Sequence, residues 1–243
     1  MAPAGTKPAR CPGGTVSELN RILISHGRKT SWMQSILVLD QMQEVRVQPD
    51  VYTCSSAINS CQLGAWQMAL QCFDRLSQTV LPNPVVYTTL MMAFSKHGEW
   101  QQALFLFHSL VVQQIQTDTI LHSAAVKACE DGSQWQVALR ILHDLSKQTL
   151  LPDTAFLNSA ISACEKSDQG EAWAWGLELL RCLWHWVLLP DAISFSAAIS
   201  ACEKAFQWPA ALLLLADVQS CSLELDIILC NAALSSCSKG PAQ

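Results

Sequence analysis

The sequence repeats itself about every 35 residues, and this repetition constrains the fold more than any other feature. The segment PDTAFLNSAISACEK at 152–166 closely resembles Pro190-Asp191 and the AISFSAAISACEK that follows at 192–204, and 118–130 repeats it more loosely. Six of the nine tryptophans recur in steps of 34, 34, 35, 38 and 35 residues, namely Trp32, Trp66, Trp100, Trp135, Trp173 and Trp208. Cysteines 129, 164, 202 and 237 recur in steps of 35, 38 and 35. Two residue types in one register indicate a structural repeat.

The recurrent Pro-Asp pair divides the chain into units. We predict a repeat array over 16–239, with units 16–50, 51–83, 84–118, 119–153, 154–191 and 192–226 and a partial unit 227–239. Residues 1–15 hold three prolines and three glycines, so this segment is expected to lack order and to oppose the amphipathic helix of a mitochondrial presequence. Residues 240–243 form a short tail. Three extra residues within 167–172 predict a longer turn in the fifth unit.

Each unit has the pattern of two helices. In the sixth, Ile193, Ala197 and Cys202 lie on one side of a helix that ends near Lys204, and a second helix begins around Gln207. Small residue pairs in the first helices, such as Ala197-Ala198, allow neighbouring helices to approach closely. The expected fold is all-α: an alpha-alpha solenoid, a right-handed superhelix of helical hairpins whose first helices line a concave face. The repeated tryptophans are expected to pack between helices.

Composition narrows the classes of function. No apolar run reaches the roughly 18 to 20 residues of a membrane span. Five of the eleven cysteines share one repeat position and no CxxC spacing occurs, so we expect reduced, buried thiols and neither a metal nor another cofactor. The net charge of −5 opposes binding dominated by phosphates. This net charge is compatible with recognition of a nucleic acid through its bases, or with binding of a protein partner.

Several repeat positions resemble the pentatricopeptide repeat family, in a P-type array. The shared features are the 35-residue hairpin, a Lys near the end of the first helix, the terminal Pro-Asp and the Ala-Leu steps at 69–70, 103–104, 138–139 and 211–212. The similarity covers 16–239, whereas the 34-residue unit and Gly-Tyr pair of the tetratricopeptide repeat are not seen. The resemblance implies binding of single-stranded RNA, one base per repeat, in RNA processing, stability, editing or translation in a mitochondrion or chloroplast.

In this family a polar residue early in the first helix and the last residue of the unit read the base. The first set here is Asn20, Ser55, Thr88, Ser123, Asn158, Ser196 and Asn231; the closing set is Asp50, Asn83, Asp118, Asp153, Asp191 and Asp226. Asn, Ser and Thr are poor residues for a helix interior, yet they alone fill the first position seven times. The closing residues also have the identity of helix N-caps, so capping alone is the alternative.

The family's pairing rules turn these residues into a base sequence. Asn with Asp resembles a uridine reader, Ser or Thr with Asp a guanosine reader, and Ser with Asn an adenosine reader. In chain order the hypothesised site is 5′-UAGGUG-3′.

Two further sets follow from the resemblance. Base-stacking side chains would be Tyr52, Val85, Ile120, Ile193 and Ile228, and Ser17 and Ala155 depart from this pattern. Phosphate contacts would come from Arg28, Lys96, Lys166, Lys204 and Lys239, and Leu63 and Asp131 interrupt the series. Ordinary helix packing is the alternative for the first set, and favourable placement of a cation at a helix C-terminus is the alternative for the second.

No catalytic arrangement is present in the sequence. The six histidines fall at different repeat positions, and no Gly-rich phosphate loop or Ser/His/Asp arrangement stands out. We therefore predict a binding protein and not an enzyme. The rival hypothesis is a helical-repeat scaffold that binds a protein or peptide, which the acidic net charge favours.

Overall fold

The computed structural model describes residues 32–44, 50–61, 66–77, 82–113, 115, 117–148, 150–167, 170–221 and 227–238. Every regular element in these ranges is an α-helix. The helices fall into two compact units, 1–97 and 98–243, and each is described by itself. No helix in the described part of the chain is long and apolar enough to span a membrane.

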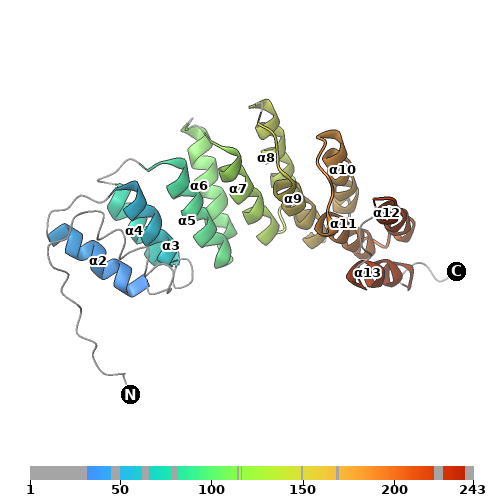
Figure 1. The fold of residues 1–243 in the computed structure, drawn as a ribbon, viewed down its shortest axis with the longest axis horizontal. Helices are drawn as coiled ribbons and strands as arrows, with labels where there is room; N and C mark the ends of the chain where they lie inside the picture. The colour runs from blue at the N-terminus through green and yellow to red at the C-terminus, as the bar shows by residue number, and fades with distance from the viewer. Residues whose placement is uncertain are drawn as a thin grey trace, which may run out of the picture. The chain divides into compact units, whose positions relative to one another are not determined.

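The first unit contains four described helices (Figure 1). They are α2 (Trp32–Glu44), α3 (Val51–Cys61), α4 (Trp66–Ser77) and α5 (Pro84–Lys96). Helices α3 and α4 form one hairpin, and α5, the first helix of the next repeat, packs against both. An ion pair of 3.0 Å between Arg75 of α4 and Asp40 of α2 joins the second helices of consecutive repeats.

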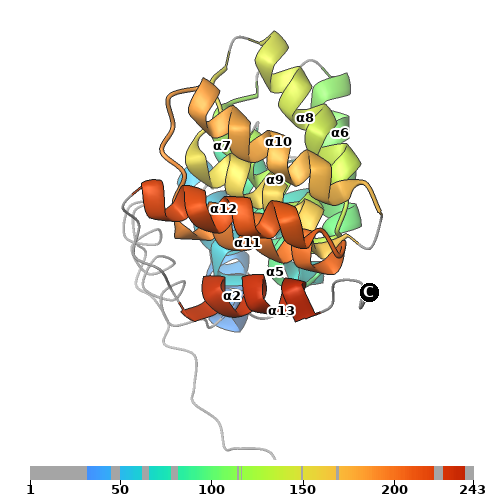
Figure 2. The same cartoon turned by 90° about the vertical axis from the view of Figure 1, so that its right-hand side faces the viewer.

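The described part of the second unit contains eight helices, which continue the alternation. They are α6 (Trp100–Val112), α7 (Thr119–Asp131), α8 (Trp135–Lys147), α9 (Thr154–Lys166), α10 (Ala172–His185), α11 (Ala192–Lys204), α12 (Trp208–Ser220) and α13 (Ile227–Ser238). The odd-numbered helices are the first helices of their repeats, and α7, α9, α11 and α13 pack in succession (Figure 2). Each even-numbered helix packs against the first helix that follows it.

Small side chains explain how the first helices approach one another. Ala125, Ala160, Ala198 and Ala233 occupy the same repeat position, and each is at most 1% exposed. Larger side chains from other positions of the first helices, such as Phe156 and Phe195, are also buried. The core is therefore a series of similar layers, which is the packing of a solenoid.

Two of the repeated tryptophans, at the starts of α4 and α6, show the predicted packing between helices and lie against the next repeat. Trp66, the first residue of α4, lies edge-on to Phe94 of α5 with ring centroids 5.9 Å apart. Trp100, the first residue of α6, lies so close to Gly132 at the end of α7 that a Cβ there would come within 2.4 Å of the indole. Gly132 is thus required by the close approach of this ring.

These features confirm the expected fold class, an all-α solenoid of helical hairpins. The first helices begin at Val51, Pro84, Thr119, Thr154, Ala192 and Ile227, each the first residue of a unit defined by the Pro-Asp register. The extra residues of the fifth unit lie between Lys166, the last residue of α9, and Ala172, the first of α10. The segments 1–15 and 240–243 lie outside the described residues.

Candidate nucleic-acid interface

The closing residues of the repeats cap the helices that follow them. A side-chain oxygen of Asn83, Asp118, Asp153 and Asp191 accepts a hydrogen bond from the backbone N–H three residues later, at 3.1, 2.8, 2.7 and 2.9 Å. Asp50 accepts the same bond from Thr53 at 2.8 Å. All five residues therefore cap a helix, as the alternative considered above predicts. In each aspartate the second carboxylate oxygen takes no part in the capping hydrogen bond. Asp226 lies outside the described residues.

The described polar residues at the fifth position of the units differ in their exposure to solvent. Thr88 is 7% exposed, and its hydroxyl donates to the Pro84 carbonyl at 2.9 Å. The Ser123 hydroxyl donates to the Thr119 carbonyl, also at 2.9 Å. Ser55 and Ser196 are half-buried, Asn231 is exposed, and Asn20 lies outside the described residues.

Asn158 is the member of this set with the fullest network. Its side-chain nitrogen lies 3.1 and 3.2 Å from the two carboxylate oxygens of Asp191, the closing residue of the same repeat. Its side-chain oxygen accepts a hydrogen bond of 2.6 Å from Ser194, at the start of α11. The structure thus joins the two residues that the sequence predicts to read one base, and adds a third that the sequence analysis missed.

The pKa of Asp191 reflects this network. Partial burial acts to raise it, but hydrogen bonds from the Ser194 backbone and hydroxyl and from Asn158 prevail and lower the pKa below its ordinary value. Asp191 is therefore an anion at neutral pH, and it faces the amide of Asn158 as an acceptor.

The predicted stacking residues form a repeated exposed apolar position. Tyr52, Val85, Ile120 and Ile193 are 75, 56, 64 and 62% exposed. They occupy the second residue of α3, α5, α7 and α11, and Ala155 is exposed at the same position of α9. Single exposed apolar side chains are common, but these recur at one position of the repeat. The side chain of Ile228 is not described.

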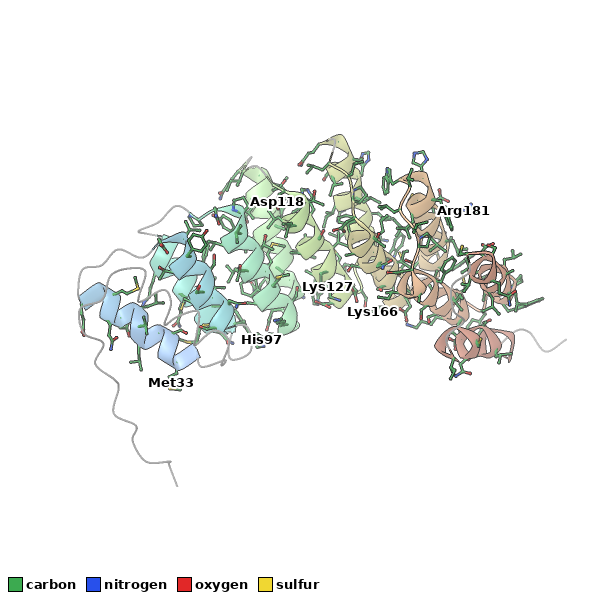
Figure 3. All side chains as sticks on the ribbon, in the orientation of Figure 1. Met33, His97, Asp118, Lys127, Lys166 and Arg181 are labelled. Atoms are coloured by element: carbon green, nitrogen blue, oxygen red, sulfur yellow. The ribbon has the colours of Figure 1, made fainter. Side chains whose placement is uncertain are left out.

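Two of the predicted phosphate lysines are held by the preceding repeat. Lys166 of α9 pairs with Glu130 of α7 at 2.9 Å, and Lys127 pairs with the other oxygen of Glu130 at 2.8 Å. Lys204 of α11 lies 2.9 Å from the Glu165 carbonyl and 3.5 Å from its carboxylate. Figure 3 shows Lys127 and Lys166 near each other, at the end of the helices away from Asp118.

The glutamates of these ion pairs were missed by sequence reasoning. The signal was present, since Cys-Glu-Lys recurs at 164–166 and 202–204 and Cys129-Glu130 begins the same triplet. Partial burial acts to raise the pKa of Glu130, but Lys127 and Lys166 lower it below its ordinary value. Lys96 is exposed, and Arg28 and Lys239 lie outside the described residues.

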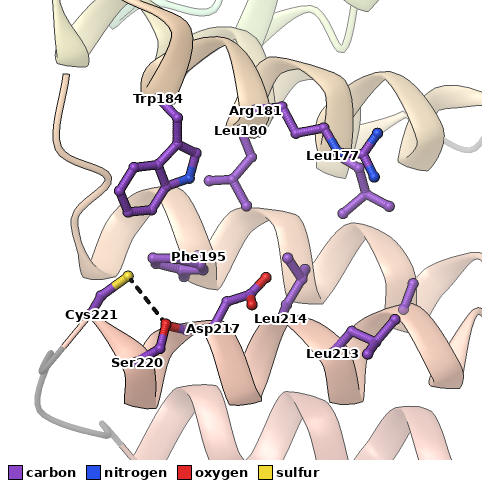
Figure 4. A pocket seen from close by; sticks show the side chains of 11 residues that line it. Leu177, Leu180, Arg181, Trp184, Phe195, Leu213, Leu214, Asp217, Ser220 and Cys221 are labelled. Carbon is purple, nitrogen blue, oxygen red and sulfur yellow. Dashed lines mark hydrogen bonds between the residues drawn. The ribbon is translucent and has the colours of Figure 1, made fainter. Parts of the chain in front are cut away.

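A separate groove of about 410 Å³ lies between α10 and α12. Leu180 and Trp184 line one wall, Leu213 and Leu214 the other, and Phe195 of α11 also borders it (Figure 4). None of the predicted RNA-contact residues lines this groove. It is therefore a feature of the second helices and separate from the candidate site.

The buried cysteines are structural. Burial raises the pKa of Cys129 and Cys164 to about 12 and that of Cys202 to about 11. These thiols stay protonated at neutral pH and are buried side chains of the first helices α7, α9 and α11. Among the described residues no group of three or more His, Cys, Asp or Glu side chains is placed to hold a metal ion.

The fold and this interface define a class: helical-hairpin repeat proteins whose first helices carry the candidate contact residues. Comparison with known proteins agrees. The family model of the pentatricopeptide repeat matches residues 85–115. A pentatricopeptide repeat-containing protein of Arabidopsis thaliana is 29% identical over 107 residues, covering 43% of this chain and 16% of the relative. A chloroplastic one from the same plant is 25% identical over 129 residues, 40% of this chain and 16% of the relative.

Solved structures show the same fold. The pentatricopeptide repeat protein PPR10 from maize has a TM-score of 0.63 at 22% identity, over 92% of this chain and 32% of that one. The pentatricopeptide repeat domain of Arabidopsis thaliana protein-only RNase P 1, solved in complex with tRNA, has a TM-score of 0.60 at 13% identity, over 73% of this chain and 93% of that one.

This chain is similar to pentatricopeptide repeat proteins in one matched repeat, in two relatives and in fold. It spans only 16% of the length of the two Arabidopsis relatives.

Proposed function

We propose that this chain binds single-stranded RNA in a sequence-specific manner, one base per repeat, and that it acts by binding and not by catalysis. The observation that carries the proposal is the arrangement repeated at the start of the first helices α3, α5, α7 and α11. An exposed apolar side chain, a small polar side chain three residues later and a capping Asp or Asn recur in the same register. Apolar surface can stack on a base, and the polar pair can hydrogen-bond its edge.

The fifth repeat illustrates the arrangement best. Asn158 and Asp191 are hydrogen-bonded to each other, and Ile193 is 62% exposed two residues beyond Asp191. A base stacked on Ile193 would gain roughly 1–3 kcal/mol before the strand-ordering cost. Its edge would then lie within the range of the Asn158 amide.

The proposed site is 5′-UAGGUG-3′. The test measures binding of this RNA by the full chain with fluorescence anisotropy, against a scrambled sequence of equal composition. We expect clear preference for 5′-UAGGUG-3′, and equal binding of the two RNAs would contradict the proposal. The variant Asn158→Ser should move the preference at the fifth base from U to G and leave the other five bases unchanged.

A protein or peptide partner is the second candidate. The net charge of −5 and the pairing of Lys166 and Lys204 with glutamates of the preceding repeats favour it, since both weaken attraction to a polyanion. A scaffold of this kind would show no base-specific shift in Asn158→Ser. The same experiment therefore separates the two functions.

We place the activity in a mitochondrion or chloroplast, in RNA processing, stability, editing or translation. The support is the similarity to pentatricopeptide repeat proteins, one of which is chloroplastic. Imaging of the full-length protein fused to a fluorescent protein tests the location, and sequencing of co-purified RNA tests the process.

A further inference from the structure

The serine that binds the Asn158 amide has no role in the pairing rules considered above. Ser194 is the third residue of the sixth repeat and is fully buried. Its hydroxyl lies 2.6 Å from the side-chain oxygen of Asn158 and 2.9 Å from a carboxylate oxygen of Asp191. It also accepts a hydrogen bond of 3.2 Å from the Asp191 backbone N–H. Ser194 thus contacts both members of the predicted base-reading pair.

The chemistry of these groups fixes the orientation of the amide. Asp191 is an anion that only accepts hydrogen bonds, so the NH₂ group of Asn158 must face it. The amide oxygen then points the other way, where it meets the Ser194 hydroxyl. Asn158 is only 8% exposed, so an oxygen without this donor would be left in a largely buried place.

Repeats with Ser or Thr at the fifth position need no such partner. The hydroxyls of Thr88 and Ser123 donate to carbonyls of their own helices. The third residues of the repeats that follow them are Leu121 and Phe156, both apolar and fully buried. The fifth position of these repeats offers no carboxamide oxygen to which a hydroxyl group could donate.

The same relation runs through the whole sequence. Two complete repeats have Asn at the fifth position, and the repeat that follows each of them has a hydroxyl side chain at its third position. Four complete repeats have Ser or Thr at the fifth position, and the repeat that follows each of them has an apolar side chain at its third position. The six pairs are Asn20 with Thr53, Ser55 with Val86, Thr88 with Leu121, Ser123 with Phe156, Asn158 with Ser194, and Ser196 with Leu229. Thr53 repeats the capping pair of Ser194, since its hydroxyl lies 2.8 Å from Asp50.

We propose that Ser194 is a positioning residue that fixes the carboxamide of Asn158 and thereby gives the fifth repeat its preference for uracil. This inference rests on the proposed RNA binding. A fixed amide presents one N–H donor and one carbonyl lone pair in a set order. Uracil offers the matching N3–H donor beside a carbonyl acceptor, whereas cytosine has an acceptor at N3.

The test compares binding of 5′-UAGGUG-3′ and 5′-UAGGCG-3′ by the full chain. Ser194→Ala removes the hydroxyl but keeps the backbone N–H that Asp191 caps. We expect the preference for U over C at the fifth base to fall about three- to tenfold, the value of one hydrogen bond. Discrimination at the other five bases should not change.

Two variants act as controls. Ser194→Thr retains the hydroxyl and should retain the preference for U. Ser236→Ala removes another buried hydroxyl, one that donates to the Ala233 carbonyl at 2.7 Å and not to a predicted base-reading residue, and should also leave the preference unchanged. The pKa of Asp191, followed by NMR, should rise in Ser194→Ala, because one of the bonds that lowers it is lost.

The outcomes separate the two proposals. If the wild-type chain does not distinguish 5′-UAGGUG-3′ from its scrambled form, the proposed sequence-specific RNA binding is wrong. The proposed role of Ser194 is then wrong as well. If the wild type prefers U at the fifth base and Ser194→Ala prefers it equally, only the role of Ser194 is wrong. Loss of the preference in Ser194→Thr as well as Ser194→Ala would also overturn it, because the hydroxyl would then not be the cause.

Discussion

The two ends of the first helices in the second unit use their charged groups differently. At the N-terminal ends, Asp118, Asp153 and Asp191 accept hydrogen bonds from the helices that they precede. At the C-terminal ends, Glu130 and Glu165 hold lysines of the next repeat. The first kind of contact is local and leaves the neighbouring apolar residue exposed. The second joins consecutive repeats and neutralises the cations.

The helix dipole explains part of this difference. An aspartate at a helix N-terminus and a lysine at a C-terminus are both favourable, but a glutamate at a C-terminus is not. Glu130 and Glu165 each stand one residue from the last residue of their helices. Their pairing with Lys166 and Lys204 offsets this unfavourable position, and it also ties the neighbouring helices together.

The largest effect is expected at the N-terminal end of α11. Asp191→Ala removes a helix cap, worth about 0.5–2 kcal/mol, and leaves the nearly buried Asn158 amide without its acceptor, which costs about 1–3 kcal/mol. We expect the free energy of unfolding to fall by about 2–4 kcal/mol in urea denaturation.

Asp153→Ala is the matched control for this prediction. Asp153 caps α9 through Phe156 in the same way, but no fifth-position amide bonds to it in the described residues. Its loss should cost about 1 kcal/mol. Equal effects of the two substitutions would show that the Asn158 network adds nothing to stability.

A smaller effect is expected at the C-terminal end. Glu130→Gln breaks the contacts with Lys127 and Lys166, whose side chains are 53 and 43% exposed. Because these cations are partly solvated, we expect a loss of about 1 kcal/mol in the free energy of unfolding. Asp144→Asn, which breaks the more exposed i,i+3 pair with Lys147, should change stability by less than about 0.5 kcal/mol.

Acid should weaken both ends of these helices. The pKa of Glu130 is lowered from its ordinary 4.5 and that of Asp191 from 3.8. A group with a depressed folded pKa stabilises the protein above its unfolded pKa, and this stability is lost as the pH falls through the folded value. Stability should therefore decline below about pH 4.5, and Glu130→Gln should show a shallower decline in circular dichroism melts. An identical decline in the variant would contradict this.

The smallest effect concerns the salt dependence of RNA binding. Five free phosphate lysines or arginines would give a log–log slope of roughly −3.5, at about 0.7 per phosphate. Since glutamates already pair with Lys166 and Lys204, we expect a shallower slope for the wild type. The double variant Glu130→Gln and Glu165→Gln should bind 5′-UAGGUG-3′ more tightly, with a slope steeper by about 1.4. Unchanged slopes would mean that these lysines do not contact phosphate.

Most of the fold could be predicted from the sequence, because a repeat reveals its own boundaries. The Pro-Asp register predicted where α5, α7, α9 and α11 begin, and the tryptophans predicted the starts of the second helices. Capping by Asp153 and Asp191 was also predictable, since the cap depends on backbone geometry within four residues. These contacts are local, so adjacent residues determine them.

Contacts between repeats were decided only by the tertiary structure. Glu130 meets Lys166 and Asn158 meets Ser194 across 36 residues of chain, and the spacing of the helices sets which atoms meet. The sequence shows that a lysine is a cation and that an asparagine is polar. Which of their donors and acceptors are already bonded depends on side chains one repeat away. The sequence therefore determined the hairpins and the candidate positions, whereas packing between hairpins decided which of those side chains are buried or paired.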